Sequence, residues 1–231
     1  MDSVTYDFHL HSCLSPCADD DCTPANLAGI CHLAGLDAVA LTDHNSSANC
    51  RAFLKRAAEY GLIALPGMEL TTSEEVHVVC LFADIDEAER FSGEVYARLP
   101  NILNRPDRFG NQLICDENDR PSGAPDKFLL GATDIGIYDV AAMVRARGGV
   151  AFPAHIDRDS FSLLSNLGLW DSGMGFRFAE RTRDADLSLL PDVPYLINSD
   201  SHRLDAVPDA RHRLELERRN AQSIIDALRK L

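Results

Sequence analysis

Histidines and carboxylates recur at the ends of short apolar segments along this chain of 231 residues. His9 and His11, for example, follow the first such segment and are separated by one residue. Residues i and i+2 of a strand point to the same side, so both imidazoles can face one point. Six of the eight histidines fall, with acidic residues, into groups of this kind, which are His9-Leu10-His11, Asp43-His44, Glu69, His77, His155 and Asp200-Ser201-His202.

Imidazoles and carboxylates in one site are the ligands of transition metals such as Zn, Mn or Fe. Each group alone could be a core or surface histidine, but independent accidents would not place all of them at the same edge of a fold. In parallel α/β folds the loops at the carboxyl ends of the strands form the site. The set exceeds what one ion can use, so it predicts a polynuclear centre with a bridging carboxylate. His77 fits least well, because it precedes most of its apolar segment.

The elements that must position these groups alternate between strand and helix. We expect strands over residues 4–8, 37–41, 62–65, 76–82, 149–154, 195–199 and 213–216. We expect helices over residues 24–34, 47–60, 138–147 and 220–230. This alternation predicts βαβ units and a parallel sheet in one domain over residues 1–231. Residues 84–137 break the rhythm and are interpreted as an insertion packed on the domain, with a helix over 88–99 and a hairpin over 110–121.

The composition limits the classes of partner. The net charge is −14, from 36 acidic and 22 basic residues, and there is no basic block. No stable complex with nucleic acid is therefore expected, because backbone binding needs clustered cations. No apolar run is long enough for a membrane span and no export signal is visible, so we expect a cytoplasmic protein without a membrane partner. The oligomeric state is not predicted.

Seven cysteines in such a chain favour free thiols over a disulfide framework. Cys13, Cys17 and Cys22 lie beside the first histidine group. They could bind a soft metal or an iron–sulfur cluster, but no fourth cysteine is near, so we prefer small buried thiols that pack a loop.

Together, the motifs resemble the PHP superfamily (polymerase and histidinol phosphatase domains), in the family's order and over most of the chain. The matching motifs are His9-Leu10-His11-Ser12, Thr42-Asp43-His44, Gly67-Met68-Glu69, His77, Pro153-Ala154-His155 and Ser199-Asp200-Ser201-His202. The resemblance implies an α/β fold, a distorted (β/α)7 TIM-like barrel of the PHP type with a small insertion. It also implies a centre of two to three divalent transition metals (Zn, Mn or Fe).

The resemblance also implies how the ligands are shared among the metals. The first metal would take His9, His11, Glu69 and Asp200. The second would share Glu69 and take His77 and His155. The third would take His44, His202 and an acidic residue after the first motif, for which we choose Asp19 and leave Asp20 and Asp21 open.

The family's chemistry is phosphoester hydrolysis, in which a hydroxide bridging two metals attacks phosphorus. We count five residues as catalytic candidates. Three of them, Glu69, Asp200 and His202, are also expected metal ligands, and the other two are Asp43 and Arg158. Asp43 would orient His44 or a neighbour, unless it only caps a turn. Arg158 would grip a phosphate, unless it is a surface residue paired with a neighbouring carboxylate.

The expected function is hydrolysis of a small phosphorylated metabolite or nucleotide. One alternative is a 3′–5′ exonuclease or nucleotide phosphatase that acts on short oligonucleotides. A second is a metal-binding regulatory module without turnover. A third is a metal-dependent amide hydrolase.

Overall fold

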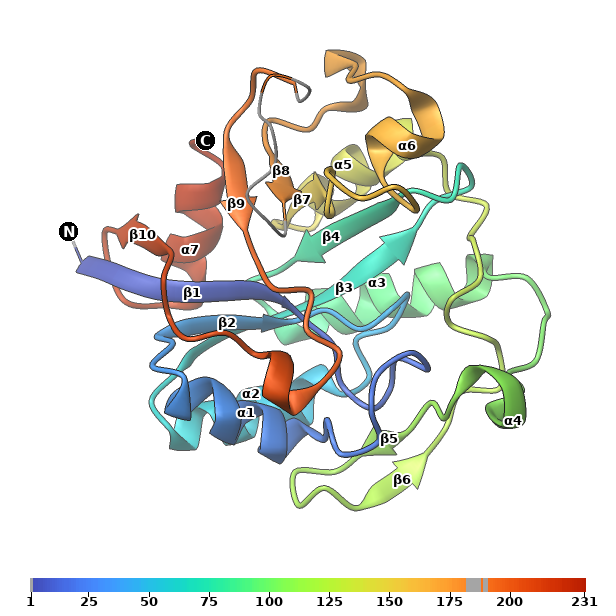
Figure 1. The fold of residues 1–231 in the computed structure, drawn as a ribbon, viewed down its shortest axis with the longest axis vertical. Coiled ribbons are helices and arrows are strands. Elements are labelled where there is room, and N and C mark those ends of the chain that lie inside the picture. Colours follow the sequence, from blue (N-terminus) through green and yellow to red (C-terminus); the bar gives the residue numbers. More distant parts are fainter. Residues whose placement is uncertain (1, 182–187, 189–190) are drawn as a thin grey trace.

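The computed structural model describes residues 2–181, 188 and 191–231. Its main sheet has the strand order β10-β1-β2-β3-β4-β7. These strands are β1 (Asp2–Leu10), β2 (Ala38–Leu41), β3 (Ile63–Thr71), β4 (His77–Leu81), β7 (Val150–Pro153) and β10 (Arg213–Leu216). The sheet curls, and helices cover its outer face (Figure 1).

Four of the longer helices pack on the outer face of this sheet, and the fifth packs on its inner face. The four outer helices are α1 (Pro24–Leu33), α2 (Cys50–Glu59), α3 (Ile85–Arg98) and α5 (Ile137–Ala146), and the inner one is α7 (Ala221–Leu228). The short ones are α4 (Pro106–Phe109), α6 (Leu163–Leu167) and the 3₁₀ turns at Ser172–Met174 and Leu204–Ala206. Helices α1 and α2 share an apolar cluster with outward side chains of β2, and α3 and α5 share one with β3 and β4. No helix within the described residues is long and apolar enough to cross a lipid bilayer.

The inner face of the sheet is closed at one end by α7. Alternate residues such as Tyr6, Ala40 and Val79 form one buried cluster with Ile224 and Leu228 of α7. The period of two is what a strand with one face in a core requires. The helix therefore plugs the amino end of the barrel and leaves the carboxyl end for polar groups.

Two further strands complete a ring. β8 (Ala179–Arg181) and β9 (Tyr195–Ile197) pair in parallel. The amide of Ile156, just beyond β7, donates to the carbonyl of Glu180 at 2.9 Å, and the amide of His11 donates to the carbonyl of Ser201 at 2.9 Å. These bonds connect β7 to β8 and β9 to β1, which confirms the expected distorted barrel.

The expectation of a parallel sheet is only partly correct. β1, β2 and β3 are parallel, whereas β4 runs antiparallel to both β3 and β7, and β10 runs antiparallel to β1. The reason is that a short turn, rather than a helix, joins β3 to β4, and a short turn permits only antiparallel pairing. β4 therefore begins at the edge where β3 and β7 end, and this places His77 at the same edge as the other groups.

The segment interpreted as an insertion contains a helix and a hairpin. The helix is α3, and it packs on the main sheet through Phe91 and Val95. The hairpin is formed by β5 (Ile114–Cys115) and β6 (Pro121–Gly123), which pair in antiparallel fashion. The amide of Leu113 donates to the carbonyl of Cys13 at 2.9 Å, so this part of the chain contacts the loop after β1. Its status as an insertion stays a prediction.

Candidate metal centre

A bulge in β1 turns the first two histidines into the barrel. Tyr6 and Phe8 belong to the inner cluster, but Leu10 belongs to the outer cluster with α1 and α2. The pairing register with β2 shifts between Asp7 and Leu10. A one-residue shift moves every following side chain to the other face, so His9 and His11 point inward.

The other groups reach the same place from their own strands. Glu69 follows Leu65 at even spacing along β3, and His77 is the first residue of β4. His44, His155, Asp200 and His202 come directly after β2, β7 and β9. All are buried except His202, whose side chain is a quarter exposed. The structure thus brings together eight of the nine predicted ligands, which are His9, His11, His44, Glu69, His77, His155, Asp200 and His202.

Four side chains surround one point. The Nε2 atoms of His9 and His11 are 3.1 Å apart. Asp200 Oδ1 lies 3.2 Å from His9 Nε2 and 3.1 Å from His11 Nε2. Oxygens of Glu69 lie 3.4 Å from each of these nitrogens. Four ligands in a tetrahedron about an ion at ~2.0–2.1 Å are separated by about 3.3 Å, so these spacings match the first predicted ligand set.

Glu69 also faces three other imidazoles. Its Oε1 lies 3.0 Å from His77 Nδ1 and 3.0 Å from His155 Nε2. Its Oε2 lies 3.0 Å from His44 Nδ1. Both oxygens of one buried carboxylate are therefore shared among nitrogen donors, which is the arrangement of a bridging ligand.

A third cluster of ligand atoms is formed by His11, His44 and His202. The rings of His11 and His202 stack with centroids 4.0 Å apart. Asp19 does not join this cluster: its side chain is exposed and lies 3.7 Å from Arg203 Nε. Asp20 is held elsewhere, where it accepts a hydrogen bond from Asn111 at 2.6 Å. An acidic ligand for a third metal stays a prediction.

Glu180 is a functional candidate that sequence reasoning missed. Both of its carboxylate oxygens lie 2.9 Å from His9 Nδ1, and they also accept from the His155 amide at 3.0 Å and from Asn198 at 2.8 Å. This partner fixes the hydrogen of His9 on Nδ1 and leaves the Nε2 lone pair free for a metal. The only signal in the sequence is an acidic residue after an apolar run, without a characteristic spacing.

Asp43 acts on the ring of His11 through a serine. Ser15 Oγ donates its hydrogen to Asp43 Oδ1 at 2.7 Å, so the ring Nδ1 of His11, 2.9 Å away, donates to Ser15. Ser12 donates to Asp43 through its amide and its hydroxyl, at 2.7 and 2.6 Å. The His11 Nε2 lone pair is thereby directed at the cluster, so the neighbour that Asp43 orients is His11 rather than the His44 ring.

The electrostatics divide the imidazoles into two kinds. Burial alone would lower the pKa of His9, but surrounding carboxylates, Glu180 first among them, hold it well above its usual value. Against the same burial, Asp200 and Glu69 raise the pKa of His11 to about 9. Burial lowers the pKa of His44 to about 3 and that of His202 to about 4. The centre thus attracts positive charge at His9 and His11, and offers neutral donors at His44 and His202.

Two of the ligand positions carry backbone strain. His155 has a φ of 28° and Asp200 a φ of 52°, in the left-handed region that side chains with a Cβ rarely adopt. Such strain persists where the surrounding structure imposes it, and it collects at functional sites.

The donor set fits divalent transition metals. Among the described residues, five buried atoms of the ligand side chains make no hydrogen bond: His44 Nδ1, Glu69 Oε2, His77 Nδ1, His155 Nδ1 and Asp200 Oδ1. Buried polar atoms without a partner are costly, and cations held by the two ligand sets would satisfy those of His44, Glu69, His77 and Asp200.

A small cavity of about 250 Å³ opens beside the centre. Besides the ligands it is lined by Cys17, Leu130, Arg158, Ser160 and Phe161. Arg158 Nη1 lies 2.6 Å from Asp200 Oδ2, and its side chain is 43% exposed. The ring of Phe161 stacks on His77 with centroids 4.8 Å apart. The cavity therefore has one guanidinium and one aromatic wall above the cluster.

The three early cysteines point to different places. Cys13 Sγ lies 3.7 Å from Cys115 Sγ, and Cys22 Sγ lies 3.4 Å from the carbonyl of His202. Cys17 lines the cavity. Within the described residues they form no common metal cluster. Cys13 and Cys22 are buried, whereas Cys17 is exposed, so a role in loop packing stays a prediction.

Comparisons with known proteins bear on the family and the fold of the chain. The PHP domain family matches residues 7–118. A search of curated proteins finds no significant match. Among solved structures, the lesion-specific endonuclease PfuEndoQ from Pyrococcus furiosus has a TM-score of 0.72 at 19% identity, over 100% of this chain and 56% of that chain.

Two other solved structures extend the comparison. A complex of Endonuclease Q with a 27-mer duplex that carries an abasic lesion has a TM-score of 0.72 at 18% identity, over 100% of this chain and 57% of that chain. A proposed metal-dependent phosphoesterase from Bifidobacterium adolescentis has a TM-score of 0.63 at 18% identity, over 97% of this chain and 96% of that chain. This chain thus spans a little over half the length of the two endonuclease chains.

Proposed function

The chain belongs to the PHP superfamily, and from this premise we propose that it hydrolyses a phosphoester of a small phosphorylated metabolite or nucleotide. The observation that carries the proposal is the set of five spacings of 3.1–3.4 Å among the nitrogens of His9 and His11 and the oxygens of Glu69 and Asp200. At such spacings the imidazole lone pairs and the carboxylates suit coordination of a common cation better than direct contacts with one another.

We assign the ligands of two metals from these contacts. His9, His11, Glu69 and Asp200 would hold one ion, and Glu69, His77, His155 and His44 surround the place of a second. His202 is kept for a third, and Asp19, whose exposed side chain lies beside Arg203, would have to move to join it. When bound, Zn, Mn or Fe ions at such a centre activate water at neutral pH and neutralise charge on a phosphoryl group.

The residues of the chain then have separate tasks. Glu180 and the Ser15–Asp43 pair hold the rings of His9 and His11 in the tautomers that leave Nε2 free. Arg158 reaches the mouth of the cavity, where its guanidinium can bind two phosphoryl oxygens. In the reaction water adds to phosphorus, the P–O ester bond breaks, and the alcohol leaves with a proton.

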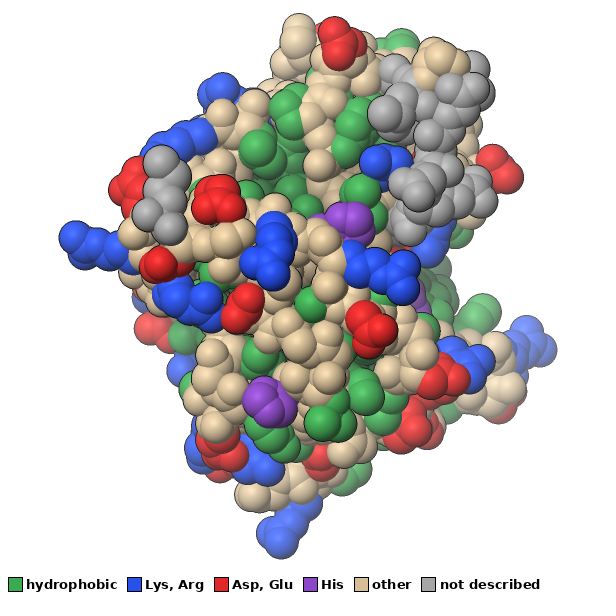
Figure 2. All heavy atoms as spheres, turned by 60° about the vertical axis from the view of Figure 1, so that its left-hand side comes forward, with side chains coloured by type: hydrophobic (Ala, Val, Ile, Leu, Met, Phe, Trp, Pro, Cys, Tyr) green, Lys and Arg blue, Asp and Glu red, His purple; other side chains and the backbone are tan. Residues whose placement is uncertain are grey.

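The size and charge of the site favour a small substrate. The cavity holds about 250 Å³, enough for a phosphate with a small organic group. Figure 2 shows acidic and basic side chains interspersed over one face of the molecule, without the continuous basic surface that a nucleic-acid backbone needs.

A second candidate is cleavage of a nucleic acid, and the similarity to Endonuclease Q favours it. Phe161 offers an aromatic face at the cavity, on which a base could stack. Nucleic-acid cleavage differs from hydrolysis of a small ester because it also requires contacts between the protein and the nucleic-acid chain outside the cavity.

One experiment separates the two candidates. Protein reconstituted with Zn, Mn or Fe(II) is given phosphomonoesters, mononucleotides, short oligonucleotides and a duplex with an abasic site. We expect phosphate release from small esters and slower cleavage of the polymers. Faster cleavage of the duplex would favour the second candidate, and no hydrolysis with any metal would contradict both.

A further inference from the structure

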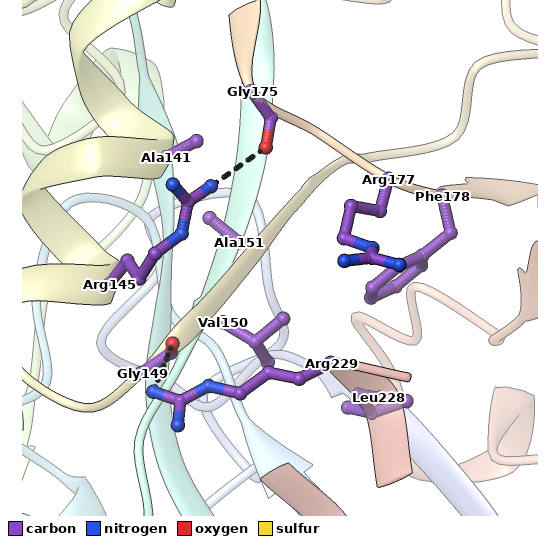
Figure 3. Close-up of a pocket in the computed structure, with 10 residues that line it drawn as sticks. All are labelled: Ala141, Arg145, Gly149, Val150, Ala151, Gly175, Arg177, Phe178, Leu228 and Arg229. Atoms are coloured by element: carbon purple, nitrogen blue, oxygen red, sulfur yellow. Dashed lines mark hydrogen bonds between the residues drawn. The ribbon is translucent and has the colours of Figure 1, made fainter. Parts of the chain in front are cut away.

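A second and larger cavity lies at the other end of the barrel. It holds about 510 Å³ at the amino end of β7, beside the α7 plug (Figure 3). Among the described residues its lining contains three arginines and no carboxylate: Ala141, Arg145, Gly149, Val150, Ala151, Gly175, Arg177, Phe178, Leu228 and Arg229. We call it the arginine pocket.

The three guanidinium groups come from three separate elements. Arg145 lies in α5, Arg177 precedes β8, and Arg229 follows α7. Arg145 Nη2 donates to the carbonyl of Gly175 at 3.0 Å, and Arg229 Nη2 donates to the carbonyl of Gly149 at 3.1 Å. Neither carbonyl belongs to the helix of its arginine, so these bonds hold the side chains across the pocket, as Figure 3 shows.

Arg147, at the carboxyl end of α5, is a useful comparison because its charge and its hydrogen bonds have partners. It donates to the carbonyl of Met143 within α5 at 2.8 Å and pairs with Glu94. It therefore caps its own helix and has its charge balanced. By contrast, within the described part of the chain none of the three pocket arginines forms an ion pair, although the protein carries 36 acidic residues. The Nε of Arg229 is buried and makes no hydrogen bond there.

The unused donors favour an anion with more than one charged group. Each guanidinium has five N–H donors, and the bonds described above use one in Arg145 and one in Arg229. Three cations around one cavity repel one another unless an anion lies between them. Guanidinium groups bind phosphate through paired hydrogen bonds, and groups on different sides of a cavity can each take a separate phosphate.

The arginine pocket is separate from the metal centre. Val150 lines the pocket at the first residue of β7, and His155 lies two residues past the end of that strand. Five residues of extended chain span about 16 Å. None of the described residues that line the pocket contributes a ligand atom to the centre.

We propose that the arginine pocket binds a small molecule with two or more linked phosphate groups, at a site independent of the metal centre. Arg145 and Arg229 hold one phosphate group each from opposite helices, and Arg177 contributes from the strand side. The proposal does not depend on the reaction assigned to the centre, so it can fail while the hydrolase assignment stands.

Calorimetry with methylenediphosphonate tests this site, because that compound has no ester bond to hydrolyse. Metal-loaded protein is titrated with it and with methylphosphonate, and the metal content is checked afterwards. We expect the diphosphonate to bind at least tenfold more tightly. Equal affinities, or no saturable binding to the wild type, would overturn the proposal.

Variants locate the binding. Arg145→Gln and Arg229→Gln are expected to raise Kd about tenfold or more, whereas Arg147→Gln and Arg158→Gln should change it less than twofold. Weaker binding only in Arg158→Gln would place the ligand at the metal centre and refute the proposal. If the first two variants do not fold, Arg177→Gln decides: its side chain is exposed and makes no hydrogen bond among the described residues, and an unchanged Kd would contradict the assignment.

Discussion

The two ends of β7 carry opposite charge preferences and achieve them in different ways. At the carboxyl end, the side chains of Glu69 and Asp200 are each 1% exposed and lie among imidazoles that other side chains hold in place. At the amino end, Arg145 and Arg229 border an open cavity and are held by backbone carbonyls. Water cannot reach the polar atoms of a buried site, so each of them needs a partner within the site. Such a site therefore fixes the position of its cation closely. In an open site, water can hydrogen-bond to the free N–H groups of the arginines until an anion binds.

The largest expected effect concerns the bridging carboxylate. Glu69→Gln should lower kcat for an aryl phosphate by about a thousandfold, because a neutral amide bridges metals poorly and the charge stabilisation is worth several kcal/mol. Steady-state kinetics with reconstituted protein measure it. Glu75→Gln, on the exposed turn after β3, is the matched control and should keep wild-type turnover. Near-normal turnover in Glu69→Gln would remove that residue from the centre.

A smaller effect is expected from the carboxylate behind His9. Glu180→Gln keeps the size of the side chain but weakens the bond that fixes His9 and the contact with the His155 amide. Removal of such a partner typically costs 10–100-fold in metal affinity. Competition with a fluorescent chelator measures it, with the exposed Glu215→Gln as control. Equal affinities in both variants would show that Glu180 only supports the fold.

The pH dependence of stability sharpens the same comparison. In chelator-treated protein the pKa of His11 rises from 6.5 to about 9 on folding, so its proton stabilises the fold fully below pH 6.5. That contribution, on the order of 3 kcal/mol, is lost as the pH rises through about 9. Denaturant titrations should therefore show that the free energy of unfolding falls between pH 6.5 and 9. The Arg177→Gln variant is the control, and its free energy of unfolding should fall by the same amount as that of the wild type. Metal-loaded protein should lose less, because the cation replaces the proton, and equal losses would argue against a cation at His11.

The smallest effect tests the independence of the two ends. Arg145→Gln should leave kcat and KM for an aryl phosphate within twofold of wild type, because Arg145 is remote from the ligands. Arg158→Gln, at the cavity beside the centre, should instead raise KM about tenfold, as expected for loss of a charged phosphate contact. A similar rise in both variants would mean that the arginine pocket serves the reaction.

Short motifs made the metal centre predictable from the sequence, since spacing alone puts His9 and His11 on one face. His77 looked misplaced because its strand was expected to be parallel, and a turn that reverses the chain explains its position. Glu180 escaped notice because one acidic residue carries no spacing signal. Asp19 shows the converse, since a motif position did not bring its side chain to the cluster.

The arginine pocket could not be predicted in this way. Arg145, Arg177 and Arg229 are far apart in the sequence, and each alone resembles a solvent-exposed cation. Only the packing of α5, α7 and the segment before β8 brings them to one cavity. Sites assembled by tertiary packing, without a local motif, are visible only in the structure.

The metal content of the purified protein tests the central claim most directly. Elemental analysis of wild-type protein prepared without chelators should find two to three equivalents of Zn, Mn or Fe per chain, and the Glu69→Gln variant should retain fewer. A wild-type content below one equivalent, unchanged after incubation with each metal, would contradict the proposal that these imidazoles and carboxylates form a metal centre.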